Sequence, residues 1–200
     1  MTSHKLSTIL LLILISSARC GEQSPQTQAE AEEPVDSGQA KANLAKLEKE
    51  LGRLSPRGFY VVINTAANRL YLFKNGELQM EAVCSTGSGQ TLISGDRSWT
   101  FETPRGEFSI RSKTANPVWR KPDWAFLEEG EAIPADDGER LEYGVLGEYA
   151  LGIGNGYFIH GTLYTRMLGK NVTHGCVRLD SKELIQLAKT VPIGTKVYIF

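Results

Sequence analysis

From residue 58 onward, apolar and polar residues alternate in the way that is typical of β-strands. Residues 59–65, 68–76 and 78–87 are rich in β-branched and aromatic side chains, and Asn75-Gly76 is a strong hairpin signal. These three segments predict an antiparallel meander. Further strands are expected at residues 106–113, 148–153, 156–162 and 196–200. The pattern therefore indicates a mainly β domain.

Two segments carry helical signals. Four leucines at helical spacing predict a short amphipathic helix within residues 41–57, namely Leu44, Leu47, Leu51 and Leu54. Asp180 followed by Glu183 forms a capping-box signal for a helix at residues 181–190. Helices are thus expected only near the two ends of the folded part.

Two other segments show neither the alternation typical of strands nor the spacing typical of helices. Residues 87–98 are rich in glycine and serine and are expected to form a loop. Residues 114–142 contain two tryptophans, three prolines and an acidic stretch. Because loops this long inside a compact domain are often functional, we expect a lid there.

The N-terminus carries a targeting signal rather than a fold. Residues 1–20 contain an apolar run of 12 residues, Leu6–Ser17, whereas a membrane-spanning helix needs roughly 20. A secretory signal fits this length. Cys20 follows the run directly, a layout that resembles a bacterial lipoprotein and suggests a lipid tether, although Arg19 departs from the small residue expected before such a cysteine. An ordinary signal cut nearby and an uncleaved anchor are the alternatives.

Composition and charge narrow the classes of function. Residues 21–40 hold five acidic residues and no basic one, so a disordered linker is expected. The whole chain of 200 residues has 22 basic and 23 acidic side chains, which argues against a nucleic-acid partner. Three cysteines without a CxxC spacing do not make a disulfide scaffold.

Three chemically reactive side chains fall within 17 residues of one another: His160, His174 and Cys176. A nucleophilic thiol needs a base within hydrogen-bond reach, a group that orients the base, and N–H donors for the oxyanion. Gly175 suits a tight turn that exposes such donors, and Arg178 supplies positive charge near the thiol. Two alternatives stay open here: a zinc site, and ordinary turn and core residues. Cys84, within a predicted strand, is expected to be a buried core thiol.

Four segments in order resemble the L,D-transpeptidase catalytic domain family (YkuD-like) over residues 58–200. They are the opening strands from Val61 to Phe73, Thr103-Pro104-Arg105-Gly106-Glu107-Phe108, Leu146-Gly147, and His160-Gly161-Thr162 followed by Thr173-His174-Gly175-Cys176-Val177-Arg178. The resemblance implies a β-sandwich or mixed-sheet domain with a short helix after the catalytic cysteine. It implies no cofactor and no metal.

The resemblance also implies roles for the site residues. Cys176 matches the nucleophile and His160 the general base, with the Gly161 carbonyl orienting the imidazole. The backbone N–H groups of His174, Gly175 and Cys176 would form the oxyanion hole. The expected substrate contacts are Arg178, Thr173, Thr162 and the lid aromatics Trp119, Trp124 and Tyr143, for which plain packing is the alternative.

The implied substrates are peptidoglycan stem peptides in the periplasm or cell envelope, which connects the chain to cell-wall biogenesis and cell shape. A thioester on Cys176 would pass to an amine acceptor, either a second stem peptide or a lipoprotein lysine. With water as the acceptor, the same site would be an L,D-carboxypeptidase. A non-catalytic wall-binding or metal-binding envelope protein of the same fold is the competing class.

Overall fold

The computed structural model describes residues 37–54 and 56–200. The expected signal at residues 1–20, the tether at Cys20 and residues 21–36 of the expected linker lie outside the described residues. None of the helices within the described part is long and apolar enough to cross a lipid bilayer.

The first helix, α1, spans Ser37–Leu54. It begins four residues before the expected start, so the last four residues of the expected linker are helical. It ends at Leu54 rather than at 57, because Pro56 cannot continue a helix. Its four leucines are exposed, and none of its residues is buried.

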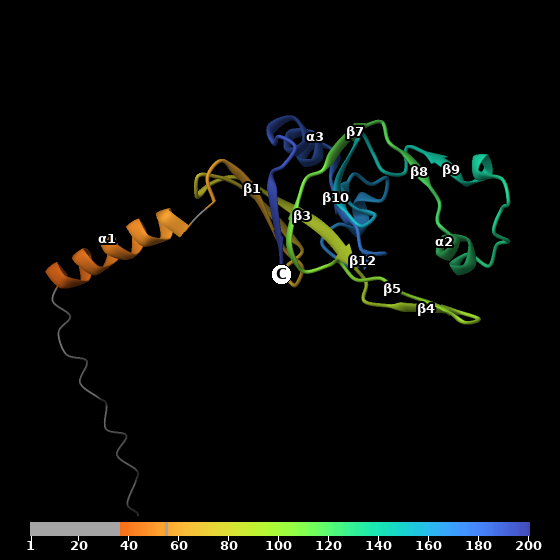
Figure 1. Cartoon of the computed structure of the whole chain (residues 1–200), viewed down its shortest axis with the longest axis horizontal. Coiled ribbons are helices and arrows are strands. Elements are labelled where there is room, and N and C mark those ends of the chain that lie inside the picture. The colour runs from red at the N-terminus through yellow and green to blue at the C-terminus, as the bar shows by residue number, and fades with distance from the viewer. Residues whose placement is uncertain (1–36, 55) are drawn as a thin grey trace, which may run out of the picture. The chain divides into compact units, whose positions relative to one another are not determined.

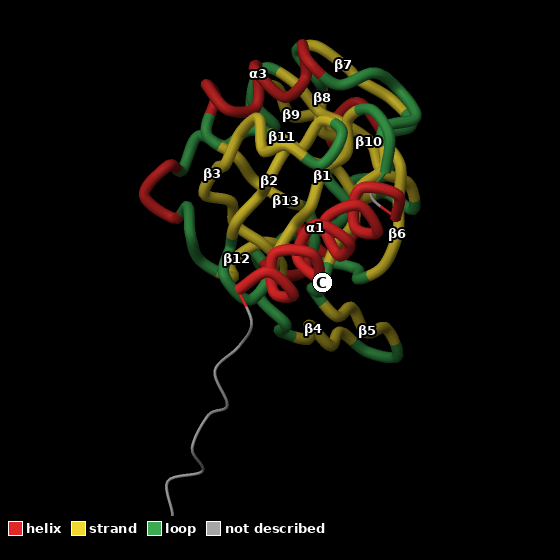
Figure 2. Tube along the Cα trace, turned by 90° about the vertical axis from the view of Figure 1, so that its left-hand side faces the viewer, coloured by secondary structure: helices red, strands yellow, loops and turns green. Residues whose placement is uncertain are grey.

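Within the described residues, ten strands form one mixed sheet, in which β12 pairs with β3 beside the main path β6-β14-β1-β2-β3-β13-β11-β10-β7. The expected mainly β fold with a mixed sheet is confirmed (Figure 1, Figure 2). The strands are β1 (Phe59–Asn64), β2 (Arg69–Lys74), β3 (Glu77–Gly87), β6 (Gly106–Ser109), β7 (Ser112–Ala115), β10 (Tyr149–Gly154), β11 (Tyr157–His160), β12 (Asn171–Thr173), β13 (Val177–Leu179) and β14 (Lys196–Ile199).

The sheet curls around a single core, and β3 joins its two halves. The antiparallel meander β1-β2-β3 forms as expected, and the far end of β3 pairs with β13. Apolar residues of both halves belong to one buried cluster, which includes Ile63 and Leu72 from the meander and Leu151, Ile159 and Leu179 from the other half.

Helix α3 spans Ser181–Thr190, as the capping signal predicts. The side chain of its N-cap, Asp180, accepts a hydrogen bond from the backbone N–H of Lys182 at 3.1 Å. Leu184 and Leu187 are fully buried and join the core cluster. The short helix after the expected catalytic cysteine is therefore present and covers the sheet.

The expected strand at 106–113 is two strands, because the chain crosses there from one half of the sheet to the other. β6 pairs with β14 and β7 with β10. Between them, the N–H of Ile110 donates to Thr195 at 2.9 Å, and the N–H of Arg111 donates to Gly152 at 2.7 Å. Those two bonds, made to different parts of the fold, bend the chain.

Both segments expected to lack regular structure contain it. Residues 87–98 include most of a hairpin, β4 (Thr91–Ser94) with β5 (Arg97–Thr100). Within residues 118–143, β8 (Val118–Arg120) pairs with β9 (Leu141–Tyr143) around α2 (Asp123–Glu128) and the 3₁₀ helix η1 (Asp137–Arg140). These elements are too short to show a clear period, so the loop predictions were wrong. We call residues 118–143 the α2 segment.

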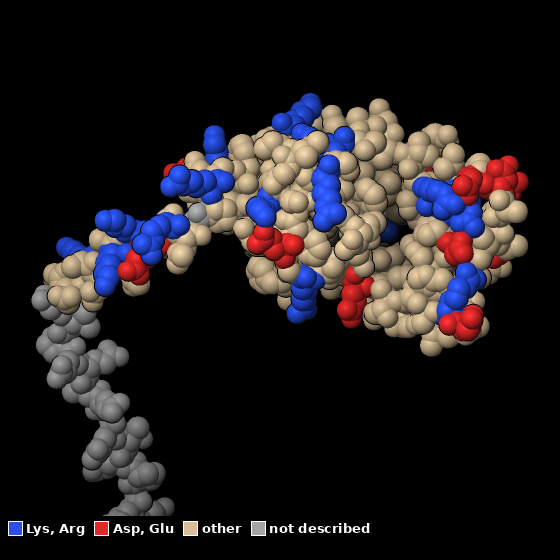
Figure 3. All heavy atoms as spheres, viewed as in Figure 1, with Lys and Arg blue, Asp and Glu red and all other residues tan. Residues whose placement is uncertain are grey.

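The α2 segment, whose elements α2, β8 and β9 are labelled in Figure 1, has a polar centre of its own. Lys121 is only 6% exposed and pairs with the carboxylates of Glu129 and Glu131, and its ammonium lies 4.5 Å from the ring centre of Phe126. Figure 3 shows basic and acidic side chains interspersed at this end of the molecule. Ion pairs around Lys121 therefore help to hold the segment together, next to the buried ring of Phe126.

We expect Lys121→Ala to loosen the α2 segment and to leave the sheet intact. The change removes the cation that neutralises Glu129 and Glu131, whose half-exposed carboxylates then repel each other. Amide hydrogen exchange in residues 118–143 should become on the order of tenfold faster, with exchange in β1 and β2 unchanged. Lys189→Ala, a surface change on α3, is the control; equal exchange in both variants would contradict the prediction.

Candidate active site

Two neighbouring parallel strands carry the expected chemistry on one face. In the register of β11 and β13, Ile159 lies opposite Val177 and His160 opposite Arg178. Ile159 and Val177 are buried in the core. Side chains alternate between the faces of a sheet, so His160 and Arg178 lie on the other face. The residue before Val177 is Cys176, which returns to the face of His160.

Electrostatic interactions connect Cys176 with Arg178, and Arg178 with His160. The backbone of Phe158, on β11, forms a hydrogen bond with the Cys176 thiol, and the Arg178 guanidinium acts on both the thiol and the His160 ring. Arg178 thus lies close enough to act on both Cys176 and His160.

The other described thiol, Cys84, lies on the opposite side of the sheet. It pairs in register with Leu179 of β13 and is fully buried in the core cluster. Burial raises the pKa of Cys84 to about 12. The expectation of a buried core thiol is therefore confirmed for Cys84.

His160 is held in one tautomer. Its Nδ1 lies 2.7 Å from the carbonyl oxygen of Gly161. A carbonyl can only accept, so Nδ1 carries the proton and Nε2 keeps its lone pair. Burial, reinforced by the positive charge of Arg178, lowers the pKa of His160 to about 4, against the opposing effect of the Gly161 hydrogen bond. The ring is therefore neutral at pH 7, with a free basic nitrogen.

Burial also acts on the nucleophile candidate. It raises the pKa of Cys176 above the usual value, while the hydrogen bond from the Phe158 backbone and the charge of Arg178 oppose the rise. Burial disfavours a charge on either group. The resting site thus holds a thiol and a neutral imidazole rather than a thiolate and an imidazolium.

Two threonines fix the loop that leads to Cys176. The Thr173 hydroxyl donates to the carbonyl of Cys176 at 2.6 Å and accepts from the N–H of Gly175 at 3.1 Å. The Thr103 hydroxyl donates to the carbonyl of Gly175 at 2.9 Å and accepts from the N–H of Gly87 at 2.8 Å. The loop is therefore braced from within by Thr173 and from outside by Thr103.

These bonds change two expectations. Thr173, expected as a substrate contact, is only 1% exposed and supports the turn instead. The N–H of Gly175, expected in the oxyanion hole, donates to Thr173. Only the N–H groups of His174 and Cys176 remain from the expected set of donors.

Gly175 is required by its surroundings. Its φ is +116°, and a Cβ there would lie 2.7 Å from a ring carbon of Tyr157 and 2.8 Å from the carbonyl oxygen of Glu102. An L side chain rarely adopts this φ, and a Cβ has no room. Any other residue at this position must displace the loop.

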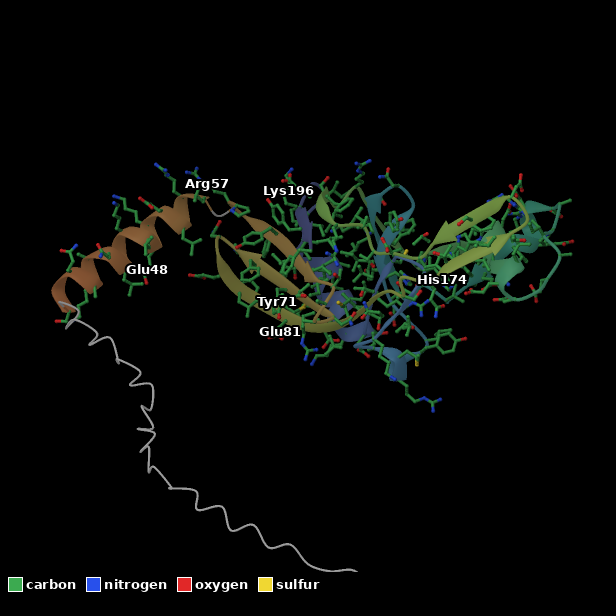
Figure 4. All side chains as sticks on the ribbon, turned by 90° about the horizontal axis from the view of Figure 1, so that it is seen from below. Glu48, Arg57, Tyr71, Glu81, His174 and Lys196 are labelled. Atoms are coloured by element: carbon green, nitrogen blue, oxygen red, sulfur yellow. The ribbon has the colours of Figure 1, made fainter. Side chains whose placement is uncertain are left out.

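His174 faces the α2 segment. Its ring stacks on Trp124 with centroids 4.3 Å apart and meets the edge of Phe101 at 4.4 Å. Its Nε2 lies 2.7 Å from a carboxylate oxygen of Glu128. Figure 4 shows His174 between the sheet and the ribbons of that segment.

The other expected substrate contacts are scattered. Trp119 packs near Trp124, with ring centroids 6.3 Å apart. Tyr143 is 74% exposed. The buried hydroxyl of Thr162 accepts from the backbone N–H of Tyr164 at 3.0 Å, so it supports its own loop. Arg178 is half-buried beside Cys176, and burial lowers its pKa.

Sequence reasoning missed Glu128 and Phe101, because α2 and the β4–β5 hairpin were expected to be loops. It had named Leu146-Gly147 without a role, and the structure supplies one. The N–H of Gly161 donates to Leu146 at 2.8 Å, and a Cβ at Gly147 would lie 2.8 Å from the Cα of Gly161. The glycine lets the two backbones touch beside His160.

Metal binding finds no support in this geometry. Within residues 37–54 and 56–200, no group of three His, Cys, Asp or Glu side chains could hold a metal ion. In the two histidines of the zinc alternative one ring nitrogen is already hydrogen-bonded: Nδ1 of His160 to the Gly161 carbonyl and Nε2 of His174 to the Glu128 carboxylate.

Comparison with known families agrees with this arrangement. The model of the L,D-transpeptidase catalytic domain (YkuD) matches residues 58–199. The chain belongs to this family. The match covers the expected domain almost residue for residue.

Relatives of this L,D-transpeptidase domain occur in Bacillus subtilis and Escherichia coli. The chain is 34% identical over 141 residues to YqjB of Bacillus subtilis, which covers 70% of each protein. It is 35% identical over 140 residues to YbiS of Escherichia coli, which covers 68% of this chain and 43% of that protein. Both relatives carry L,D-transpeptidase names, and the chain spans less than half of the second.

Solved L,D-transpeptidase structures share the fold. The domain from Xylanimonas cellulosilytica matches with a TM-score of 0.54 and 23% identity, over 74% of this chain and 62% of that one. LdtMt1, solved in complex with imipenem, matches with a TM-score of 0.51 and 19% identity, over 72% and 59%. The curled mixed sheet is therefore the fold of the family.

We expect Gly175→Ala to move the catalytic loop of the L,D-transpeptidase domain. Because the new Cβ meets Tyr157 and the Glu102 carbonyl, we expect Cys176 to shift. The rate at which iodoacetamide alkylates Cys176 should then change, and the turnover of the protein should fall on the order of 100-fold. Gly156→Ala is the matched control, since its φ is also positive at +79° but a Cβ there meets nothing within 4 Å. Equal losses in both variants would mean that backbone strain, not contact, is responsible.

Proposed function

We propose that the domain is an L,D-transpeptidase that acts on peptidoglycan stem peptides through a thioester on Cys176. One observation carries the proposal: the thiol shares a half-buried face with a neutral imidazole whose Nδ1 is fixed by a backbone carbonyl. This is a nucleophile, a base and an orienting group. The family membership and the names of the relatives support the same reaction class.

In the first half-reaction, Nε2 of His160 takes the thiol proton while the sulfur attacks the carbonyl of the L-centre of a meso-diaminopimelate residue. The tetrahedral intermediate then collapses. The bond to the terminal D-residue breaks, its amine leaves with the proton from His160, and a thioester remains. Because the resting pair is neutral, the proton moves with the attack and not before it.

In the second half-reaction, an amine attacks the thioester. His160 takes a proton from the amine and returns it to the departing sulfur, so the thiol and the neutral imidazole are restored. We propose that the backbone N–H groups of His174 and Cys176 bind the oxyanion in both halves. Arg178 would attract a substrate carboxylate, and Trp119, Trp124 and Tyr143 would line the approach.

The acceptor distinguishes the candidate functions. A second stem peptide gives a cross-link, a lipoprotein lysine gives an attached protein, and water gives an L,D-carboxypeptidase. The expected secretory signal would place the enzyme in the periplasm or cell envelope, with Cys20 as a candidate membrane tether.

Incubation of purified protein with disaccharide-tetrapeptide tests the proposal by product mass. A cross-linked dimer that lacks one terminal D-residue is the expected product. Tripeptide alone would indicate the carboxypeptidase, and unchanged substrate would favour the non-catalytic alternative.

We expect Cys176→Ala to abolish turnover, because the thioester can no longer form. Cys84→Ala should keep turnover and lose only modest stability from a small core cavity. The same pair tests acylation, since the family neighbour LdtMt1 was solved with imipenem. Intact mass after incubation with a carbapenem should show one adduct in the Cys84→Ala variant and none in the Cys176→Ala variant. An adduct that survives in Cys176→Ala would overturn the nucleophile assignment.

The pH profile tests His160 as the base. The pKa of this ring is depressed to about 4, so the base stays unprotonated until the pH falls well below the usual histidine range. kcat/KM should therefore stay level from pH 7 to pH 6 and fall at lower pH, through about 4. Arg178→Gln removes a charge that lowers this pKa and should move the acid limb upward. If kcat/KM of the wild-type protein instead fell around pH 6.5, the ordinary pKa of histidine being about 6.5, the result would contradict the assignment of His160 as the base.

A further inference from the structure

We infer that Glu128 is a positioning residue: it holds the imidazole of His174 and through it ties the α2 segment to the loop at residues 173–176. The contact between Glu128 and His174 is seen in the structure and does not depend on which reaction the protein catalyses. Its consequence for catalysis rests on the proposed function, in which the backbone N–H of His174 binds the oxyanion.

Three side chains from outside the loop surround the His174 ring. Trp124 covers one face, with an interplanar angle of 26°, and Phe101 meets the ring nearly at right angles, at 83°. Glu128 accepts the hydrogen bond at Nε2. Trp124 and Glu128 lie at opposite ends of α2, and Phe101 follows β5 directly. We call this arrangement the His174 clamp.

The clamp gives the two site histidines opposite tautomers. The carboxylate of Glu128 can only accept, so Nε2 of His174 carries a proton. In His160 the proton is on Nδ1, because the Gly161 carbonyl accepts there. His174 thus has no lone pair at Nε2 to receive the thiol proton, whereas His160 does, which favours His160 as the base. Glu128 therefore gives the ring of His174 a different hydrogen-bond partner, and a different proton position, from those of His160.

The clamp also links the α2 segment to the oxyanion donors. The carboxylate of Asp123, at the start of α2, pairs with Arg97 of the hairpin at 3.0 Å and with Arg140 at 2.8 Å. The helix is thus fixed to the hairpin at one end and to His174 at the other. Displacement of His174 by about 1 Å would misalign its N–H with the oxyanion, which typically costs on the order of 10²-fold in rate.

Variants of Glu128 separate positioning from local packing. Glu128→Ala removes the acceptor, and we expect kcat to fall roughly 10- to 100-fold, with KM for disaccharide-tetrapeptide nearly unchanged. Glu128→Gln keeps an oxygen that can accept from Nε2 and should restore most of kcat. Glu139→Ala, an exposed glutamate on η1 in the same segment, is the control and should behave as wild type. Loss of kcat in Glu128→Gln equal to that in Glu128→Ala would overturn the role as acceptor.

A double-mutant cycle tests whether Glu128 acts through His174. His174→Phe keeps an aromatic ring against Trp124 but has no N–H for Glu128. If the clamp operates, the double variant Glu128→Ala/His174→Phe is no slower than His174→Phe alone. Rate losses that multiply would show independent action and would overturn the inference.

A spectroscopic measurement makes the inference independent of the enzymatic assignment. The nitrogen chemical shifts of the His174 ring in the wild-type chain should report the Nε2–H tautomer, and Glu128→Ala should abolish that preference. A neutral wild-type ring with its proton on Nδ1 and none on Nε2 would overturn the clamp, whatever the activity. A fixed tautomer together with no turnover on any stem peptide would instead refute the proposed function and leave the clamp in place.

Discussion

The register of two parallel strands is the constraint on which the active site depends. Because Ile159 lies opposite Val177, the apolar side chains of both strands enter the core together. The alternation of a β-strand then sends His160, Arg178 and the adjacent Cys176 to the other face. A slip of one residue would bury the reactive groups in the core and expose the apolar ones. Core packing therefore enforces the geometry that the chemistry needs.

Burial on that face sets the protonation of the site. Removing water disfavours charge on both the Cys176 thiol and the His160 ring, and Arg178 further disfavours a charged imidazole while favouring a thiolate. The neutral pair is the outcome. In such a site the thiol keeps its proton until substrate is bound, and the proton is transferred as the sulfur attacks.

Hydrogen bonds and packing contacts from other parts of the fold hold the short loop between β12 and β13 in place. Thr103 and Thr173 hold its carbonyl and N–H groups, and Gly175 fits a space that excludes any Cβ. The His174 clamp supports the loop from the α2 segment. The loop, the hairpin region and the α2 segment are thus connected by side-chain contacts, although Phe101 and His174, for example, lie 73 residues apart in the sequence (174 − 101).

The sequence by itself determined the meander, α3, the buried position of Cys84, and the family with its candidate nucleophile and base. These follow from local period, capping residues and short motifs, which need no knowledge of distant contacts. Only the tertiary structure decided that Thr173 braces the loop, that the Gly175 N–H is already used, and that Glu128 meets His174. Each of these depends on which atoms lie within about 3 Å, and partners such as Glu128 and His174 are 46 residues apart. No local pattern encodes such a distance, so hydrogen-bond partners, and with them the tautomers of the two histidines, are fixed only when the chain has folded.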